Sequence, residues 1–240
     1  MHQTKKKVGL DLGESLSCTG QNNPLFDAVV GVLREMGGSV HLDPHGENLV
    51  RRRRATEVGE CPFVVEVQGW PNLMHEFVHI LALGYLEEDS GFNYGWIPLD
   101  VTQTLHRKCL WEELSCCVIS CNYMSFFPTE QSKAPFDCRD SMTMAKVLQQ
   151  TQTVIRWFSE QIEILPVFYG LEANPAEFVT LIENCTRTHG RELNEIYDRL
   201  QHRVYESIAA TGLSTDLLQS LSSFANYYSF ESLWEQYRAN

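Results

Sequence analysis

A short β-branched run, Phe63 to Val67, is followed almost at once by an uncharged segment with two histidines four residues apart. The run predicts a strand, because valine and phenylalanine favour the pleated backbone of a sheet. The segment after Trp70 predicts a helix from about Pro71 to Leu86. Residues four apart lie on one face of a helix, so His75 and His79 are expected to point together. This strand and helix constrain the fold more than any other part of the chain.

Helical patterns dominate the remaining sequence. An amphipathic helix is predicted over residues 23–38, with Pro24 in its first turn and Gly37–Gly38 as its stop. A second helix is predicted from near Val101 through "LWEELSCCVIS". Further helices are predicted over residues 142–165, 174–212 and 214–237. Gly212 is the predicted stop of the second of these, and Ser214 or Thr215 the predicted N-cap of the third.

The connecting segments are interpreted from their composition. Residues 1–23 are expected to be flexible, residues 39–60 polar and turn-rich, residues 87–100 an aromatic loop, and residues 122–141 irregular. There is no internal repeat. The sequence therefore predicts one mainly helical α+β domain over residues 1–240, with a small sheet and a helical C-terminal part from residue 140.

Composition limits the classes of partner. The chain has 240 residues, 43% of them hydrophobic, and a formal net charge of −12. General binding to nucleic acid or to an anionic membrane needs basic surface, so neither partner is expected. No stretch approaches the ~20 apolar residues of a membrane span, and the N-terminus lacks the apolar core of a signal peptide. A cytoplasmic protein is predicted.

The basic run Arg51 to Arg54 stands out against this acidic background. A solvated loop is the favoured interpretation, since charge runs mostly lie in water. The alternative is a docking patch for an acidic partner.

The eight cysteines include Cys116, Cys117 and Cys121 on one predicted helix. Paired C-x-x-C spacing, which a cysteine metal site would need, is missing. A reducing compartment would keep these residues as thiols. We interpret most of them as small core residues.

His75, Glu76 and His79 form an H-E-x-x-H pattern. Two imidazoles on one helical face can bind one ion, and Glu76 can hold or deprotonate a water on that ion. Two histidines leave the coordination shell incomplete, so a third protein ligand is expected. The bare pattern also occurs by chance in proteins without a metal, so the flanking sequence has to support it.

Helical geometry predicts the third ligand. When the predicted helix is plotted at ~100° per residue, its apolar positions cluster on one arc. Glu113 falls at the edge of this arc and Glu112 nearly opposite. Glu113 is therefore the predicted ligand, with Glu112 expected in water and kept as the alternative. His106 is a weaker candidate, expected at the surface or beside a ligand, and His41 and His45 are expected to be exposed.

Two histidines and a carboxylate serve two kinds of chemistry. With Zn²⁺ they activate water for hydrolysis. With Fe²⁺ they leave open positions for O₂ and substrate. The spacing alone does not choose between the two.

The flanking sequence resembles the bacterial elongation factor P hydroxylase family, whose members modify the lysine-derived side chain of that translation factor. Four features follow in order: "FVVEVQGW" leading into "LMHEFVH", the aromatic "FNYGWIP", the glutamate of "WEEL", and the closing stretches "DRLQHRVYESIAATG" and "LLQSLSSFANYYSFES". The resemblance covers about residues 63–122 and 196–237.

The resemblance implies a hydroxylase with a zincin-like active-site helix. The implied metal ligands are His75, His79 and a glutamate at 112 or 113, with Glu76 assisting as an acid or base. The chain departs from the family by extra residues before position 60 and between 125 and 195. These insertions border the site and leave the identity of the substrate open.

Aromatic side chains are the candidates for a substrate pocket. Phe92, Tyr94 and Trp96 could roof the metal or stack on a cationic group. Tyr227, in a tyrosine pair near the C-terminus, is a further candidate. The simpler interpretation of all four is packing, which is the commoner role of aromatic residues.

The sequence favours an O₂-dependent hydroxylase that uses Fe²⁺. A zinc hydrolase or peptidase is the second hypothesis, and an inactive module that keeps the scaffold for binding is the third. The substrate is expected to be a protein or a small molecule near the aromatic pocket, and the oligomeric state is left open.

Overall fold

The computed structural model describes residues 24–54, 59, 61–82, 86–87, 91–92, 100–124 and 141–239. For residues 86–87, 91–92, 141–150 and 224 it describes the backbone alone. The expectation of a flexible segment over residues 1–23 lies outside these ranges.

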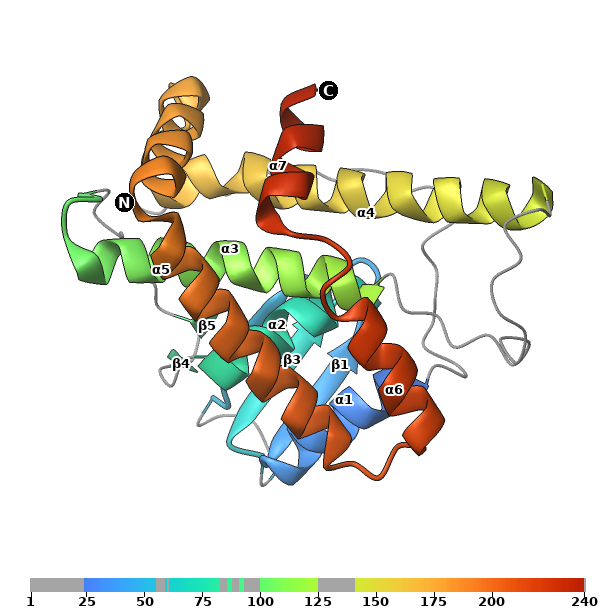
Figure 1. Cartoon of the computed structure of the whole chain (residues 1–240). Helices are drawn as coiled ribbons and strands as arrows, with labels where there is room; N and C mark the ends of the chain where they lie inside the picture. Colours follow the sequence, from blue (N-terminus) through green and yellow to red (C-terminus); the bar gives the residue numbers. More distant parts are fainter. Residues whose placement is uncertain are drawn as a thin grey trace.

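The described part of the chain is mostly helical, with a small three-stranded mixed sheet and a two-stranded antiparallel sheet of β4 and β5, which confirms the predicted fold class (Figure 1). The helices are α1 (Pro24–Glu35), α2 (Trp70–Ala82), α3 (Thr104–Met124), α4 (Ser141–Phe168), α5 (Pro175–Ala209), α6 (Thr215–Phe224) and α7 (Phe230–Ala239). The strands are β1 (Gly38–Leu42), β2 (Leu49–Arg52), β3 (Phe63–Val67), β4 (Leu86–Glu87) and β5 (Gly91–Phe92).

The strand β3 lies at the centre of the three-stranded sheet, in the order β1-β3-β2. It pairs parallel with β1 and antiparallel with β2. Its residues are almost all buried, as expected of a central strand covered on both faces. Its bounds match the predicted strand, and it leads directly into α2.

The interpretation of residues 39–60 as a turn-rich segment is wrong for β1 and β2. Both are short strands with polar, partly exposed residues, so they lack an alternating apolar pattern. The solvated-loop interpretation of the arginine run is wrong for Arg51 and Arg52, which are strand residues. Arg51 lies in β2, is buried, and pairs with Glu66 of β3 at 2.8 Å.

The local end signals of the helices are confirmed. Pro24 opens α1, and Gly37 follows its end with φ of 88°. Gly212 adopts φ of 79° after α5, a conformation that glycine tolerates without strain. Ser214 caps α6 by accepting a hydrogen bond from the Leu217 amide. The predicted helix over 214–237 is two helices, because the chain turns between α6 and α7.

The helix α3 is the centre of the molecule. It contacts α2, α4, α5, α6 and α7, and Figure 1 shows it between α4 on one side and α2 with the sheet on the other. Nearly every residue from Leu110 to Met124 is buried. A helix buried on all sides has no single polar face, so its residues cannot be assigned to core or solvent by arc alone.

Among the described helices, none has the length and apolar character that crossing a membrane requires.

Candidate metal centre

The helix α2 presents His75 and His79 one turn apart toward α3. Their Nε2 atoms lie 2.9 Å apart and their ring centroids 4.5 Å apart, with the rings nearly perpendicular. Both side chains are buried. The large apolar residues of the same helix, Leu73, Met74 and Phe77, are fully buried in the core and fix its orientation. The expected shared face of the two histidines is therefore present.

Glu113 of α3 completes a three-residue cluster. Its Oε1 lies 3.5 Å from His75 Nε2, and its Oε2 lies 3.2 Å from His79 Nε2. Its side chain is 14% exposed. The structure thus brings together the three residues that the sequence analysis selected as ligands.

Glu112, expected in water, is only 3% exposed. It faces the other way, with Lys108 Nζ at 3.5 Å and Arg199 of α5 at 3.9 Å. The expectation of a solvated Glu112 is wrong because α5 covers the side of α3 that the helical plot assigned to solvent. The side chain that faces the histidines is Glu113.

The charges of the cluster stabilise one another. Burial alone would raise the pKa of Glu113, but His79 and His75 outweigh it and hold that pKa below its usual range. Burial alone would lower the pKa of His75, but the hydrogen bond and charge of Glu113 raise it. An ionised carboxylate is therefore favoured at the position that a cation would need.

Glu76 lies beside the two histidines on α2 and is partly buried. Burial raises its pKa, and the nearby histidines only partly oppose that shift. A carboxyl group with a raised pKa next to a metal site is suited to accept and return a proton.

Two neighbouring thiols of α3 also reach this cluster. Cys116 Sγ lies 3.5 Å from His79 Nδ1, and Cys117 Sγ–H donates to Glu113 Oε1 at 3.9 Å. One ligand atom each from His75, Glu113 and Cys117 lies within 4.8 Å of the others. Burial raises the pKa of both thiols, and the charge of Glu113 adds to the effect. Both cysteines are core residues, as expected, but their contacts with the candidate ligands were not expected from the sequence.

The signal for Cys117 was present in the sequence. It follows Glu113 by four residues, the spacing that places two side chains on one helical face. Trp157 of α4 was also missed; its ring packs edge-on against His75, with centroids 5.8 Å apart.

The donor set fits a metal ion. Atoms bound to a tetrahedral ion at 2.0–2.1 Å lie about 3.3 Å from one another. The three contacts among His75, His79 and Glu113 measure 2.9, 3.2 and 3.5 Å. Both imidazoles face the cluster through Nε2, so each Nδ1 is directed away. Within the described part of the chain, His75 Nδ1 is buried without a hydrogen-bond partner.

The aromatic pocket candidates are only partly covered by the structure. Tyr94 and Trp96 lie outside the described residues, and only the backbone of Phe92 is described, in β5. Tyr227 is 61% exposed and packs against Tyr228, whose backbone binds Asn122 of α3. Asn122 is nine residues beyond Glu113, about 13 Å along the helix. The structure therefore places Tyr227 apart from the metal cluster.

The remaining histidine candidates also lie apart from the cluster. His41 and His45 are exposed, as expected. His106 is half-buried near the start of α3, two turns before Glu113.

Comparison of the chain with protein-family models, with curated proteins and with solved structures gives no match.

Proposed function

We propose that this chain is a metal-dependent enzyme that holds Fe²⁺ through His75, His79 and Glu113 and uses O₂ to hydroxylate its substrate. The observation that supports the proposal is the convergence of these donor atoms from α2 and α3. Two histidines and one carboxylate leave positions open for O₂ and substrate on a six-coordinate ion.

The cluster is shielded from solvent, which suits oxygen chemistry. His75 and His79 are buried and the Glu113 side chain is 14% exposed. A site that excludes water protects reactive intermediates from side reactions, which an oxygenase needs.

The bound ion would supply O₂ activation, and the residues around it have separate tasks. His75, His79 and Glu113 hold the ion, and the ring of Trp157 packs edge-on against His75. Glu76 accepts a proton and returns it, which its raised pKa suits. The buried surroundings exclude water.

Hydrolysis by Zn²⁺ is the second candidate, and Glu76 is the observation that favours it. A metal-bound water needs a general base within reach, and a carboxyl next to His75 with a raised pKa fits that task as well.

The proposal includes a substrate class and a location. The resemblance to elongation factor P hydroxylases makes the modified lysine of that translation factor the first substrate to test. A cytoplasmic location fits the described cysteines, which are all free thiols.

The test uses metal-free protein reloaded with Fe²⁺ or Zn²⁺ and incubated with modified elongation factor P or a captured partner, with and without O₂. We expect Fe²⁺ and O₂ to give an intact substrate with one added oxygen atom, measured by mass spectrometry, and O₂ to be consumed with product. Zn²⁺ is expected to occupy the site and inhibit, since it has no redox chemistry.

Two results would replace the proposal. Cleavage supported by Zn²⁺ without O₂ would establish the hydrolase instead. Failure of the wild-type chain to bind either ion would leave the inactive binding module as the remaining hypothesis.

A further inference from the structure

Cys117 lies one helical turn after Glu113, and its sulfur faces the same carboxylate. Cys117 Sγ is 3.9 Å from Glu113 Oε1. It also lies within 4.8 Å of a ring nitrogen of His75. The residue is fully buried, so the sulfur is shielded from solvent.

These distances suit a sulfur ligand. Zinc–sulfur bonds are about 2.3 Å and zinc–oxygen bonds about 2.0 Å, so the two atoms lie about 3.5 Å apart around a tetrahedral ion. The contact of 3.9 Å is a few tenths of an ångström longer.

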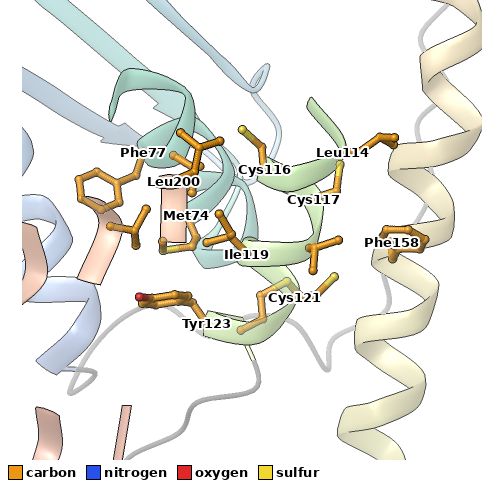
Figure 2. Packing of buried hydrophobic residues seen from close by; sticks show 14 of the residues in the cluster. Met74, Phe77, Leu114, Cys116, Cys117, Ile119, Cys121, Tyr123, Phe158 and Leu200 are labelled. Carbon is orange, nitrogen blue, oxygen red and sulfur yellow. The ribbon is translucent and has the colours of Figure 1, made fainter. Parts of the chain in front are cut away.

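The neighbouring Cys116 has the opposite relation to the cluster. It is also fully buried, but its sulfur contacts His79 Nδ1, the ring nitrogen that points away from the donor atoms. Figure 2 shows the two cysteine side chains leaving α3 in different directions. Cys116 therefore lies behind His79, on the side away from the donor atoms, and Cys117 borders the space where the ion would lie.

We propose that Cys117 is a fourth protein ligand, which makes the donor set two nitrogens, one oxygen and one sulfur. This inference rests on the metal site of the proposed function. On binding, the Cys117 S–H bond breaks, its proton leaves with a water molecule released from the hydrated ion, and the sulfur lone pair goes to the ion. Coordination to a divalent ion deprotonates a thiol outright.

A fourth protein ligand would make the site behave differently with Zn²⁺ and with Fe²⁺. Zn²⁺ in a site with four protein ligands is closed, as in structural zinc sites, and has no position for water or substrate. A six-coordinate Fe²⁺ with the same four ligands keeps two positions open. The same residues thus give an inert zinc form and an iron form able to bind O₂.

X-ray absorption spectroscopy of the zinc-loaded full chain tests the inference. In the wild type we expect one sulfur at about 2.3 Å together with nitrogen and oxygen at about 2.0–2.1 Å. Cys117→Ser should lose the sulfur contribution and bind zinc at least about 10- to 100-fold more weakly. Cys116→Ser, the matched control, should keep the sulfur.

A double variant covers the case in which Cys117→Ser does not fold. Cys116→Ser with Cys121→Ser leaves Cys117 as the single cysteine in the buried stretch from 110 to 124 of α3 and should still show sulfur at the zinc.

The outcomes separate this inference from the proposed function. Bound zinc with nitrogen and oxygen alone would overturn the fourth ligand and leave the three-residue site intact. Loss of sulfur in Cys116→Ser, or its persistence in Cys117→Ser, would also overturn it. A wild-type chain that binds no zinc would refute the fourth ligand and the metal site together.

Discussion

The two sides of α3 hold adjacent glutamates in opposite chemical surroundings. Toward α2, Glu113 faces two imidazoles and a thiol. Toward α5, Glu112 faces Lys108 and Arg199. Both carboxylates are largely shielded from water, so burial does not distinguish a metal ligand from a structural acid.

The chemical groups that surround each glutamate distinguish a metal ligand from a structural acid. Lysine and arginine are donors only, so they neutralise Glu112 permanently and offer nothing to a cation. An imidazole is either a cation or a lone-pair donor, so the partners of Glu113 can neutralise it themselves or share a metal with it. A buried acid surrounded by imidazoles is thus a better candidate ligand than one surrounded by ammonium and guanidinium groups.

The largest expected effect is on metal binding. Glu113→Gln and His79→Ala should lose stoichiometric Fe²⁺ and Zn²⁺ and with them all activity, because each removes a donor from the cluster. Glu112→Gln is the matched control on the same helix and should bind metal as the wild type does. Metal analysis after dialysis measures this. If only Glu112→Gln lost the metal, Glu112 and not Glu113 would be the third ligand.

The next effect is on catalysis without loss of metal. Glu76→Gln should keep the ion but lower the turnover rate by about 10²- to 10⁴-fold, the usual contribution of general acid–base assistance. Metal content and turnover are measured on the same preparation. Full activity would reduce Glu76 to a structural residue of α2.

On the α5 side the expected effect is on stability. Arg107 is buried, donates two hydrogen bonds to Glu192, and also binds the Val101 and Thr102 carbonyls. Arg107→Ala should lower the free energy of unfolding by about 2 kcal/mol, since it leaves charged and polar partners unsatisfied. Metal binding should stay unchanged.

Its control is Arg191→Ala. Arg191 pairs with Glu195 at the same 2.8 Å but is 92% exposed, so its loss should cost less than about 0.5 kcal/mol. Equal costs in urea unfolding would show that burial does not strengthen the Arg107 pair.

The smallest effect is a pH dependence on the same side. The hydrogen bond from Arg107, and then its charge, hold the pKa of Glu192 below its usual value. The pKa of Glu192 is lower in the folded protein than in the unfolded chain, so its ionised carboxylate stabilises the fold at a pH above the unfolded-state pKa. This stabilisation is lost as the pH falls through the folded-state pKa.

Glu192→Gln should therefore flatten the fall in unfolding free energy as the pH drops from the ordinary glutamate pKa of about 4.3 through the lower folded-state pKa. In an Arg107→Ala background the same substitution should flatten the slope much less, because Arg107 no longer contributes and the smaller contribution of His189, which also pairs with Glu192, remains. If the unfolding free energy of Glu192→Gln falls with pH as steeply as that of the wild type, Glu192 does not contribute to the acid sensitivity of the fold.

Features that local sequence determines could be predicted. The strand β3 and the histidine pair of α2 follow from short-range patterns, as do Gly212 and the Ser214 cap. The strands β1 and β2 could not be predicted this way, because their pairing with β3 supplies what their own residues lack. The break between α6 and α7 contains neither glycine nor proline to signal it.

The candidate site shows what a sequence pattern cannot predict. The helical plot selected Glu113, but it also assigned Glu112 to solvent, because it presumed that α3 has a water-facing side. The packing of α5 on that side depends on residues more than eighty positions later. Cys117 was missed because cysteine ligands were sought in C-x-x-C pairs rather than one turn from a predicted ligand.

The hydrogen bonds between α3 and the C-terminal half of the sequence also affect when α3 can reach its final position during synthesis. Arg107, near its start, binds Glu192, 85 residues later, and Asn122, near its end, binds the backbone of Tyr228, 106 residues later. Glu113 lies between these two ties. Contacts this distant along the chain close late, since loop-closure entropy opposes them until the partner segments exist. The residues up to Tyr228 therefore have to leave the ribosome before α3 is held near both ends, so the candidate ligands should become able to bind an ion only after that part of the chain has been made.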